Sequence, residues 1–250
     1  MNLLRGAMMI GAGLSMCAPA FAQTAAPAAP AAPAAAGAPA AGGAPGASIG
    51  PGWAAFSAIA SSYTDSELTV DTKEAINGKQ FDAVIRLQYK KPTLARCLVL
   101  QDTTPGTKSN KNAEIVWRGG PKIQAHPGDK YSAVVVVLDR TNPRVTDAVG
   151  FGCGQTSFDQ IRDFFLAHGT VTEAAGPSIG GVATTAETLT PTDVKADYNM
   201  TKQVMYLSAT SHLPLENIGY VGDKVVLDAK YSDIKLNPGL ANSVFNLKAS

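Results

Sequence analysis

The sequence predicts a mainly β fold, with one large, strongly curved antiparallel sheet and helices packed against its concave side. About ten strand-like segments follow one another through short turns. Strands do not alternate with helices, as they would in a parallel sheet. Only two segments carry apolar residues at helical spacing. These observations favour an α+β protein dominated by hairpins.

The chain begins with a segment typical of an export signal. Arg5 supplies a positive charge, residues 6–16 are apolar but too short for a stable membrane span, and residues 20–22 (Ala-Phe-Ala) form a cleavage site. We expect a signal peptide at 1–22 and a mature protein in the periplasm of a Gram-negative cell. A competing interpretation makes Cys17 a lipidated anchor, but the large Met16 before it disfavours that.

Residues 23–51 consist almost entirely of Ala, Pro and Gly, so they cannot bury a core and are predicted to form a disordered linker. Residues 52–250 then make one domain, long enough for a sizeable core. With a lipidated Cys17 the linker is a tether, and with cleavage after residue 22 it is a free arm.

The charge balance argues against nucleic acid as a partner. Lys+Arg minus Asp+Glu is 21 − 20 = +1, and loss of Arg5 with the signal leaves 20 − 20 = 0. A neutral domain has no general attraction for polyanions.

Cys97 and Cys153 are the cysteines of the mature chain, 56 residues apart. Two cysteines in an oxidising compartment predict one disulfide. The rival interpretation is a reactive thiol at Cys153, which would need a histidine nearby in the fold.

The first half of the domain begins with a helix at 53–63, where the apolar side chains have helical spacing. A strand at 68–76, an Asn-Gly turn and a strand at 80–89 predict a hairpin. The second strand alternates, with Phe81, Ile85 and Leu87 on one face. Pro92 interrupts it, and a strand resumes at 94–100.

The next strands are expected at 114–117 and 122–125, around a Gly-Gly turn. Residues 131–138 (YSAVVVVL) are apolar on both faces, which predicts a strand covered on both sides. Thr156 and Ser157 begin a helix, with Gln160 completing a capping-box pattern, and Gly169 ends it. Strands at 170–174, 181–189, 203–208 and 224–231 complete the sheet.

No metal or cofactor site is expected. His126, His168 and His212 have no other ligand at metal-binding spacing. The G-x-S-x-G sequence at 176–180 would make Ser178 a nucleophile only on a strand–turn–helix elbow, and the sequence around it predicts a hairpin turn instead. A serine hydrolase is the least favoured hypothesis, and no enzyme activity is expected.

Three stretches resemble the LolA/LolB-like superfamily of periplasmic carriers. They are Tyr89-Lys90-Lys91-Pro92 followed by Arg96, residues 114–122 leading to His126-Pro127-Gly128, and residues 206–247. The resemblance implies an incomplete antiparallel barrel with helices as a lid, which carries lipids or lipoproteins. In the lipoprotein carrier an arginine before the strand-ending proline helps to hold the lid closed. Lys91 occupies that place here.

The resemblance implies a non-enzymatic carrier that binds acyl chains in an apolar cavity, with lipid or acylated lipoprotein as cargo and inner- or outer-membrane proteins as possible donor and acceptor. A concave side packed solid would argue against it. The alternative is an envelope structural or interaction module with a filled core, an exposed apolar patch and a protein partner. The candidate ligand-binding residues are Phe56, Ile85, Leu87, Lys91, Leu98, Val135, Phe165, Met205 and Leu227.

Overall fold

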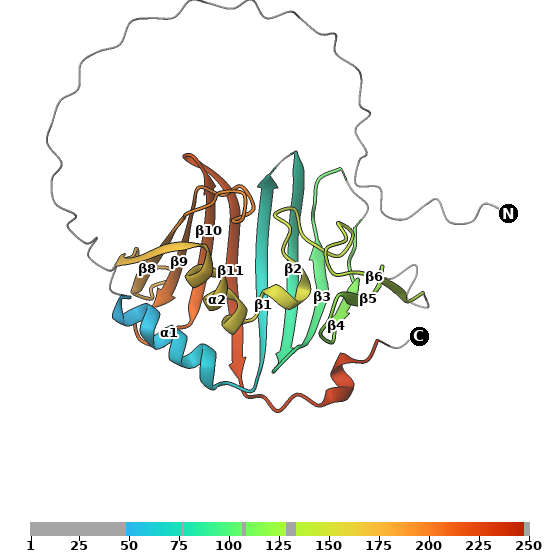
Figure 1. Cartoon of the computed structure of the whole chain (residues 1–250). Coiled ribbons are helices and arrows are strands. Elements are labelled where there is room, and N and C mark those ends of the chain that lie inside the picture. The colour runs from blue at the N-terminus through green and yellow to red at the C-terminus, as the bar shows by residue number, and fades with distance from the viewer. Residues whose placement is uncertain (1–48, 77, 107–108, 129–133, 248–250) are drawn as a thin grey trace, which may run out of the picture.

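The computed structural model describes residues 49–76, 78–106, 109–128 and 134–247. The expected signal peptide, Cys17 and most of the linker lie outside these residues. The described fold is one open antiparallel sheet of eleven strands, in the order β6-β5-β4-β3-β2-β1-β11-β10-β9-β8-β7 (Figure 1). The two halves of the chain meet where β1 pairs with β11. The strands are β1 (Asp65–Ile76), β2 (Lys79–Lys90), β3 (Leu94–Asp102), β4 (Glu114–Trp117), β5 (Lys122–His126), β6 (Val136–Asp139), β7 (Gly169–Ala175), β8 (Thr184–Pro191), β9 (Lys202–Ser208), β10 (Pro214–Val221) and β11 (Lys224–Leu236).

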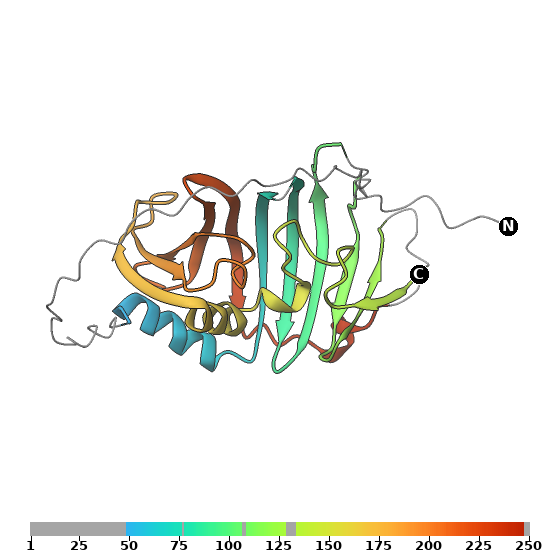
Figure 2. The same ribbon diagram turned by 45° about the horizontal axis from the view of Figure 1, so that its top comes forward.

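Two α-helices, α1 (Pro51–Ser62) and α2 (Phe158–His168), lie across the hollow of the curved sheet (Figure 2). Short 3-10 turns occur at Cys153–Gln155 (η1) and Asn242–Phe245 (η2). The predicted fold class is therefore confirmed: the sheet is curved and not closed, and helices cover its concave side. No helix in the described part of the chain combines the length and apolar character needed to cross a membrane.

Local sequence explains where the helices begin and end. Pro51 occupies the first turn of α1, where its missing N–H is not needed. At the start of α2, Ser157 stands at the cap position but makes no side-chain capping bond. The helix starts where it was expected, but the side-chain hydrogen bond of the predicted capping box is not formed.

The expectation for residues 131–138 is also wrong. The described strand there is β6, which is short and forms one edge of the sheet, so only β5 pairs with it. An edge strand lacks a neighbour on one side, and Val136 and Val137 are accordingly 38% and 61% exposed. Residues 129–133 lie outside the described part.

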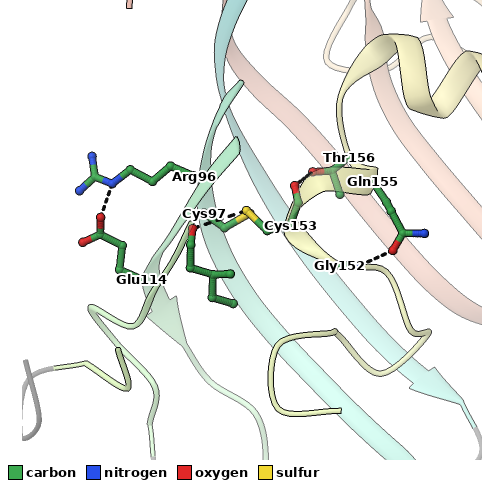
Figure 3. Close-up of a disulfide and its surroundings, with 8 residues drawn as sticks. Arg96, Cys97, Glu114, Gly152, Cys153, Gln155 and Thr156 are labelled. Carbon is green, nitrogen blue, oxygen red and sulfur yellow. Dashed lines mark hydrogen bonds and ion pairs between the residues drawn. A yellow bond between two sulfur atoms is a disulfide. The ribbon is translucent and has the colours of Figure 1, made fainter. Parts of the chain in front are cut away.

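The disulfide between Cys97 and Cys153 is confirmed, with the two Cα atoms 5.8 Å apart. Arg96 and Cys97 are consecutive on β3 and point to opposite sides of the sheet, so Cys97 reaches η1 while Arg96 pairs with Glu114 (Figure 3). The disulfide thus attaches the segment before α2 to the concave side. Gly154 packs so closely on the ring of Trp117 that an added Cβ would lie 2.3 Å from it, which explains a glycine at that position.

Candidate functional site

Strand register divides the concave side into apolar and polar rows of facing side chains. The apolar rows lie mainly on β1 to β5. One passes through Val70, Ile85 and Val99, and the next through Leu68, Leu87, Cys97 and Ile115. These rows make the surface that an acyl chain would need.

Two adjacent rows nearer the β1–β2 and β10–β11 turns mix apolar residues with acids and amides, and we call them the polar rows. They cross the sheet from β7 to β1 and follow directly from the pairing of facing residues. The first comprises Glu173, Glu187, Met205, Asn217, Ala229 and Thr72, and the second comprises Val171, Leu189, Gln203, Gly219, Leu227 and Glu74.

Side chains of the two helices fill the concave side. Trp53 and Phe56 of α1 are fully buried, and Trp53 stacks on Phe165 of α2 with ring centroids 5.1 Å apart. Phe56 meets Phe158 edge to face at 6.0 Å. Such aromatic pairs add to the stabilisation that comes from burial alone.

Polar contacts fasten both ends of α1 to the sheet. At its C-terminal end Lys91 Nζ donates to the carbonyl oxygens of Ala60 and Ser61, at 2.7 and 3.0 Å, and lies 4.2 Å from the centroid of the Tyr63 ring. A cation suits the negative end of a helix dipole.

At the N-terminal end of α1, Glu173 Oε2 accepts hydrogen bonds from the backbone N–H groups of Gly52 and Trp53, at 2.7 and 3.2 Å. Gly52 lies so close to β8 that an added Cβ would be 2.8 Å from Thr185 Oγ1. A glycine at position 52 therefore lets the helix start directly against the polar rows.

Asp159, in the first turn of α2, joins the two helices to β2. Its carboxylate accepts hydrogen bonds from the hydroxyls of Tyr63 at 2.6 Å and Tyr89 at 3.2 Å. Burial, followed by the contact with Asp159, raises the pKa of the Tyr63 hydroxyl, and burial raises the pKa of Tyr89 to about 12. Both phenols stay protonated as donors at neutral pH.

Buried carboxyl groups in the polar rows and the segments that cover them have raised pKa values. Burial raises the pKa of Glu187 to about 7, and the neighbouring Glu173 adds to the effect. Burial likewise raises the pKa of Asp147 to about 7 and that of Asp197 to about 6. The pKa of Glu74 is raised by burial and then by Asp147. In each case burial is the largest cause, because it disfavours the charged form of the acid.

The structure brings most of the predicted lining residues together. Phe56, Leu87, Phe165, Met205 and Leu227 belong to one buried apolar cluster under the helices, and Ile85 packs against that cluster. The predicted set also includes residues that lie elsewhere: Leu98 faces the opposite side of the sheet from Cys97, Val135 is half-buried just before β6, and Lys91 lies at the rim.

Sequence reasoning missed the acids of the concave side. Glu74 and Glu187 are fully or nearly fully buried. The available signal was the two-residue alternation of their strands, which puts Glu74 on the same face as Leu68 and Val70. An acid at a core-facing position of a strand indicates a buried polar contact.

Two hollows in the described part of the chain lie outside the filled core. One, of about 330 Å³, lies beside charged residues of β1, β2 and β11, including Glu67, Arg86 and Lys235. The other, of about 450 Å³, lies near Gly120 and Arg140. Neither hollow lies between the sheet and the helices, where Trp53, Phe56, Phe158 and Phe165 are buried.

Neither a metal centre nor a nucleophile elbow is found among the described residues. No group of three or more His, Cys, Asp or Glu side chains is placed to hold a metal ion. Ser178 is exposed on the turn between β7 and β8, where Ile179 and Val182 form a bridge, and a strand follows. The hairpin interpretation of this motif is confirmed.

No protein-family model matches the sequence, and no curated protein matches it. Solved structures similar to it include a LolA superfamily protein from Nitrosomonas europaea, with 12% identity, a TM-score of 0.36, and coverage of 78% of this chain and 96% of that one. A putative outer membrane lipoprotein-sorting protein domain from Vibrio parahaemolyticus has 13% identity, a TM-score of 0.40, and coverage of 76% and 93%. The lipoprotein LppX of Mycobacterium tuberculosis has 13% identity, a TM-score of 0.44, and coverage of 79% and 98%.

At 12–13% identity, these similarities concern the fold alone. The architecture that the resemblance to the LolA/LolB-like superfamily implied, an incomplete antiparallel barrel with helices across its opening, is the architecture observed.

Proposed function

We propose that this protein is a non-enzymatic carrier in the periplasm, which binds the acyl chains of a lipid or lipoprotein between its sheet and its helices. The concave side is filled by α1 and α2, which is the outcome expected of the interaction module, so a carrier must displace these helices to admit cargo. The observation that supports such displacement is the way α1 is attached. Trp53 and Phe56 come from α1, the first element of the described fold. Among the described residues, no hydrogen bond between backbone atoms joins α1 to the sheet, and its bonds to Glu173 and Lys91 involve side chains. The helix can therefore lift away without separating any strands.

The free energy gained by burying an acyl chain is similar to the free energy lost by exposing the aromatic side chains. Burial of apolar surface is worth about 25 cal/mol per Å², or about 0.8 kcal/mol per methylene. A cargo with about ten buried methylenes would therefore gain about 8 kcal/mol. Trp and Phe side chains each bury about 150–250 Å², so exposing two of them costs a similar amount. The closed and loaded states are then close enough in free energy for exchange.

Because the concave side is filled, the carrier hypothesis requires α1 to move. Lys91 and Glu173 hold its two ends by charged hydrogen bonds, which are stronger than neutral ones but reversible. Cargo would be taken up and released as these contacts open, with membrane proteins as donor and acceptor.

A covalent lock on α1 tests this. G52C combined with T185C places a thiol of α1 beside a thiol of β8, because a Cβ at position 52 would lie 2.8 Å from Thr185 Oγ1. We expect native mass spectrometry to show a lipid or an acylated peptide bound to the wild type. The oxidised double variant should bind none, and mild reduction that spares the buried Cys97–Cys153 bond should restore binding.

The two single-cysteine variants control for the substitutions themselves. Binding by the oxidised lock at the wild-type level would place the site elsewhere than under α1. A wild type that binds no lipid at all would remove the carrier hypothesis.

A second candidate, a protein-interaction module, is favoured by the edge strand β6. Val136 and Val137 of β6 are 38% and 61% exposed, and Val134 just before the strand is 48% exposed. Apolar edge strands are sites where another strand can pair. A photo-crosslinking residue at position 137 should then give a defined product in the cell, whereas the same residue at Val225, which is also exposed, should not.

A further inference from the structure

The polar rows are unusual as the lining of a site for acyl chains alone. All the buried charged residues in the described part of the chain are acids: Asp65, Glu74, Glu187 and Asp197. At the concave positions of β7 to β10 the register places no Lys or Arg. The base whose charge acts on Asp197 is His168, at the end of α2. This end of the concave side is therefore rich in hydrogen-bond acceptors and negative charge.

Gln203 and Asn217 of the polar rows form a hydrogen-bonded chain with Asp197, which lies between β8 and β9. Gln203 Nε2 donates to Asp197 Oδ1 at 2.8 Å, and Asn217 Nδ2 donates to Gln203 Oε1 at 3.4 Å. The ionised carboxylate of Asp197 can only accept, so Gln203 must turn its NH₂ group toward Asp197 and its carbonyl toward Asn217. The direction of the chain is thus set by its one charged member.

This direction leaves an unused acceptor at each end. Asn217 Oδ1 and Asp197 Oδ2 are buried and have no hydrogen-bond partner among the described residues, while Asp197 is fully buried and Asn217 is 7% exposed. A buried acceptor without a donor costs free energy, and the cost is greatest for a charged one. Both atoms are therefore ready to receive a donor from a bound molecule.

We propose that the polar rows hold the head of the cargo, and that this head donates hydrogen bonds and carries no negative charge, as an amine or a polyol does. The apolar rows would take the tail. This inference rests on the carrier function proposed above and adds to it the chemical class of the head group.

Electrostatics explains the selectivity. A phosphate or carboxylate head would bring a negative charge next to Glu173 and Asp197 at low dielectric, where like charges repel strongly. An ammonium or hydroxyl head would instead supply the donors that Asn217 Oδ1 and Asp197 Oδ2 lack. The same groups that reject an anion thus satisfy a donor.

A panel of amphiphiles with one tail and different heads tests the proposal. Dodecylamine, dodecyl maltoside, dodecyl phosphate and dodecanoate share a twelve-carbon chain, and their affinities can be measured by calorimetry below micelle formation at neutral pH. We expect the amine and the maltoside to bind at least about tenfold more tightly than either anion, the factor that one charged hydrogen bond supplies.

Variants assign the effect to the hydrogen-bonded chain. Asp197→Asn keeps the shape but removes the charge, and should cut the preference for amine over phosphate by about tenfold. Asn217→Leu removes the neutral acceptor and should weaken the maltoside more than dodecanoate. Asp193→Asn, an exposed acid on the same segment, is the matched control and should change neither.

The outcomes separate this inference from the function on which it rests. Equal binding of all four amphiphiles, or tighter binding of the anions, would overturn the head-group assignment but would not contradict the carrier function. A preference for donors that Asp197→Asn and Asn217→Leu both leave intact would also overturn it. Binding of no member of the panel would count against the carrier itself, and the head-group assignment would fall with it.

Discussion

At the scale of single residues, Lys91 connects the end of β2 with the end of α1 through one ammonium group. It donates to two carbonyl oxygens of the last turn of the helix and lies over the ring of Tyr63. Those carbonyls have no partner within the helix. The sequence resemblance drew attention to this lysine, and its contacts give it a physical role in holding α1 closed.

We predict that Lys91→Met loosens the C-terminal turn of α1 without unfolding the sheet. Methionine keeps the apolar stem of the side chain and removes the donor, which should cost the closed state about 1 kcal/mol. Hydrogen exchange followed by mass spectrometry should show the amides of α1 exchanging several times faster. Lys79→Met changes an exposed lysine and is the control. Unchanged exchange in α1 would show that Lys91 does not restrain the helix.

At the scale of elements, several segments cover the concave side, and different contacts hold them there. The start of α1 rests on Glu173, the loop before η1 rests on Glu74 through the backbone N–H of Val149, and η1 is held by the disulfide. Tyr198 of the segment between β8 and β9 packs against Phe151 and Phe164. α1 continues into β1 through residues 63–64, and side chains of Glu173 and Lys91 make its hydrogen bonds to the sheet at its two ends.

We predict that replacing both cysteines, as C97S with C153S, destabilises the protein by about 4 kcal/mol, the loop-entropy value for a 56-residue separation. Guanidinium unfolding should have its midpoint at a lower denaturant concentration in the variant. Wild type unfolded under full reduction should match the variant. Identical midpoints for the variant and the oxidised wild type would mean that the disulfide adds no stability.

At the scale of the whole molecule, the concave side of the sheet has an apolar part and a more polar part. Apolar rows lie mainly on β1 to β5, and the polar rows cross β7 to β1. Because the halves pair at β1 and β11, the acids of both halves collect on one continuous face. Their combined titration should make stability depend on pH.

We predict that stability is highest at mildly acidic pH and falls as the pH rises toward 7. Burial raises the pKa of Glu187 from 4.5 to about 7 and that of Asp147 from 3.8 to about 7. Between those values the folded state keeps protons that the unfolded state releases, so stability declines with rising pH and levels off above about 7. Thermal melting across this range measures the effect.

The variant Glu187→Gln should show a shallower decline, because glutamine stays neutral at every pH. Asp71→Asn, at an exposed position of β1, serves as the control and should follow the wild type. A wild-type melting temperature that rises steadily from pH 5 to 8 would contradict the prediction, since the linkage then has the opposite sign.

The sequence by itself determined the local elements: the two helices, the hairpins and the disulfide follow from spacing, turn residues and compartment. Alternation of apolar residues also showed that Ile85 and Leu87 share a face. These features depend on interactions between residues close in the chain, or on cysteine chemistry that admits one pairing, and so they can be inferred without coordinates.

Only the tertiary structure decided which face the helices cover and what fills it. Register placed Leu98 on the opposite side from Leu87, and the edge position left Val137 exposed. The burial of Asp197 depends on a segment that folds back over Gln203. Such facts arise from pairings between distant parts of the chain, because two-residue alternation groups side chains by face but does not say which face becomes the inside.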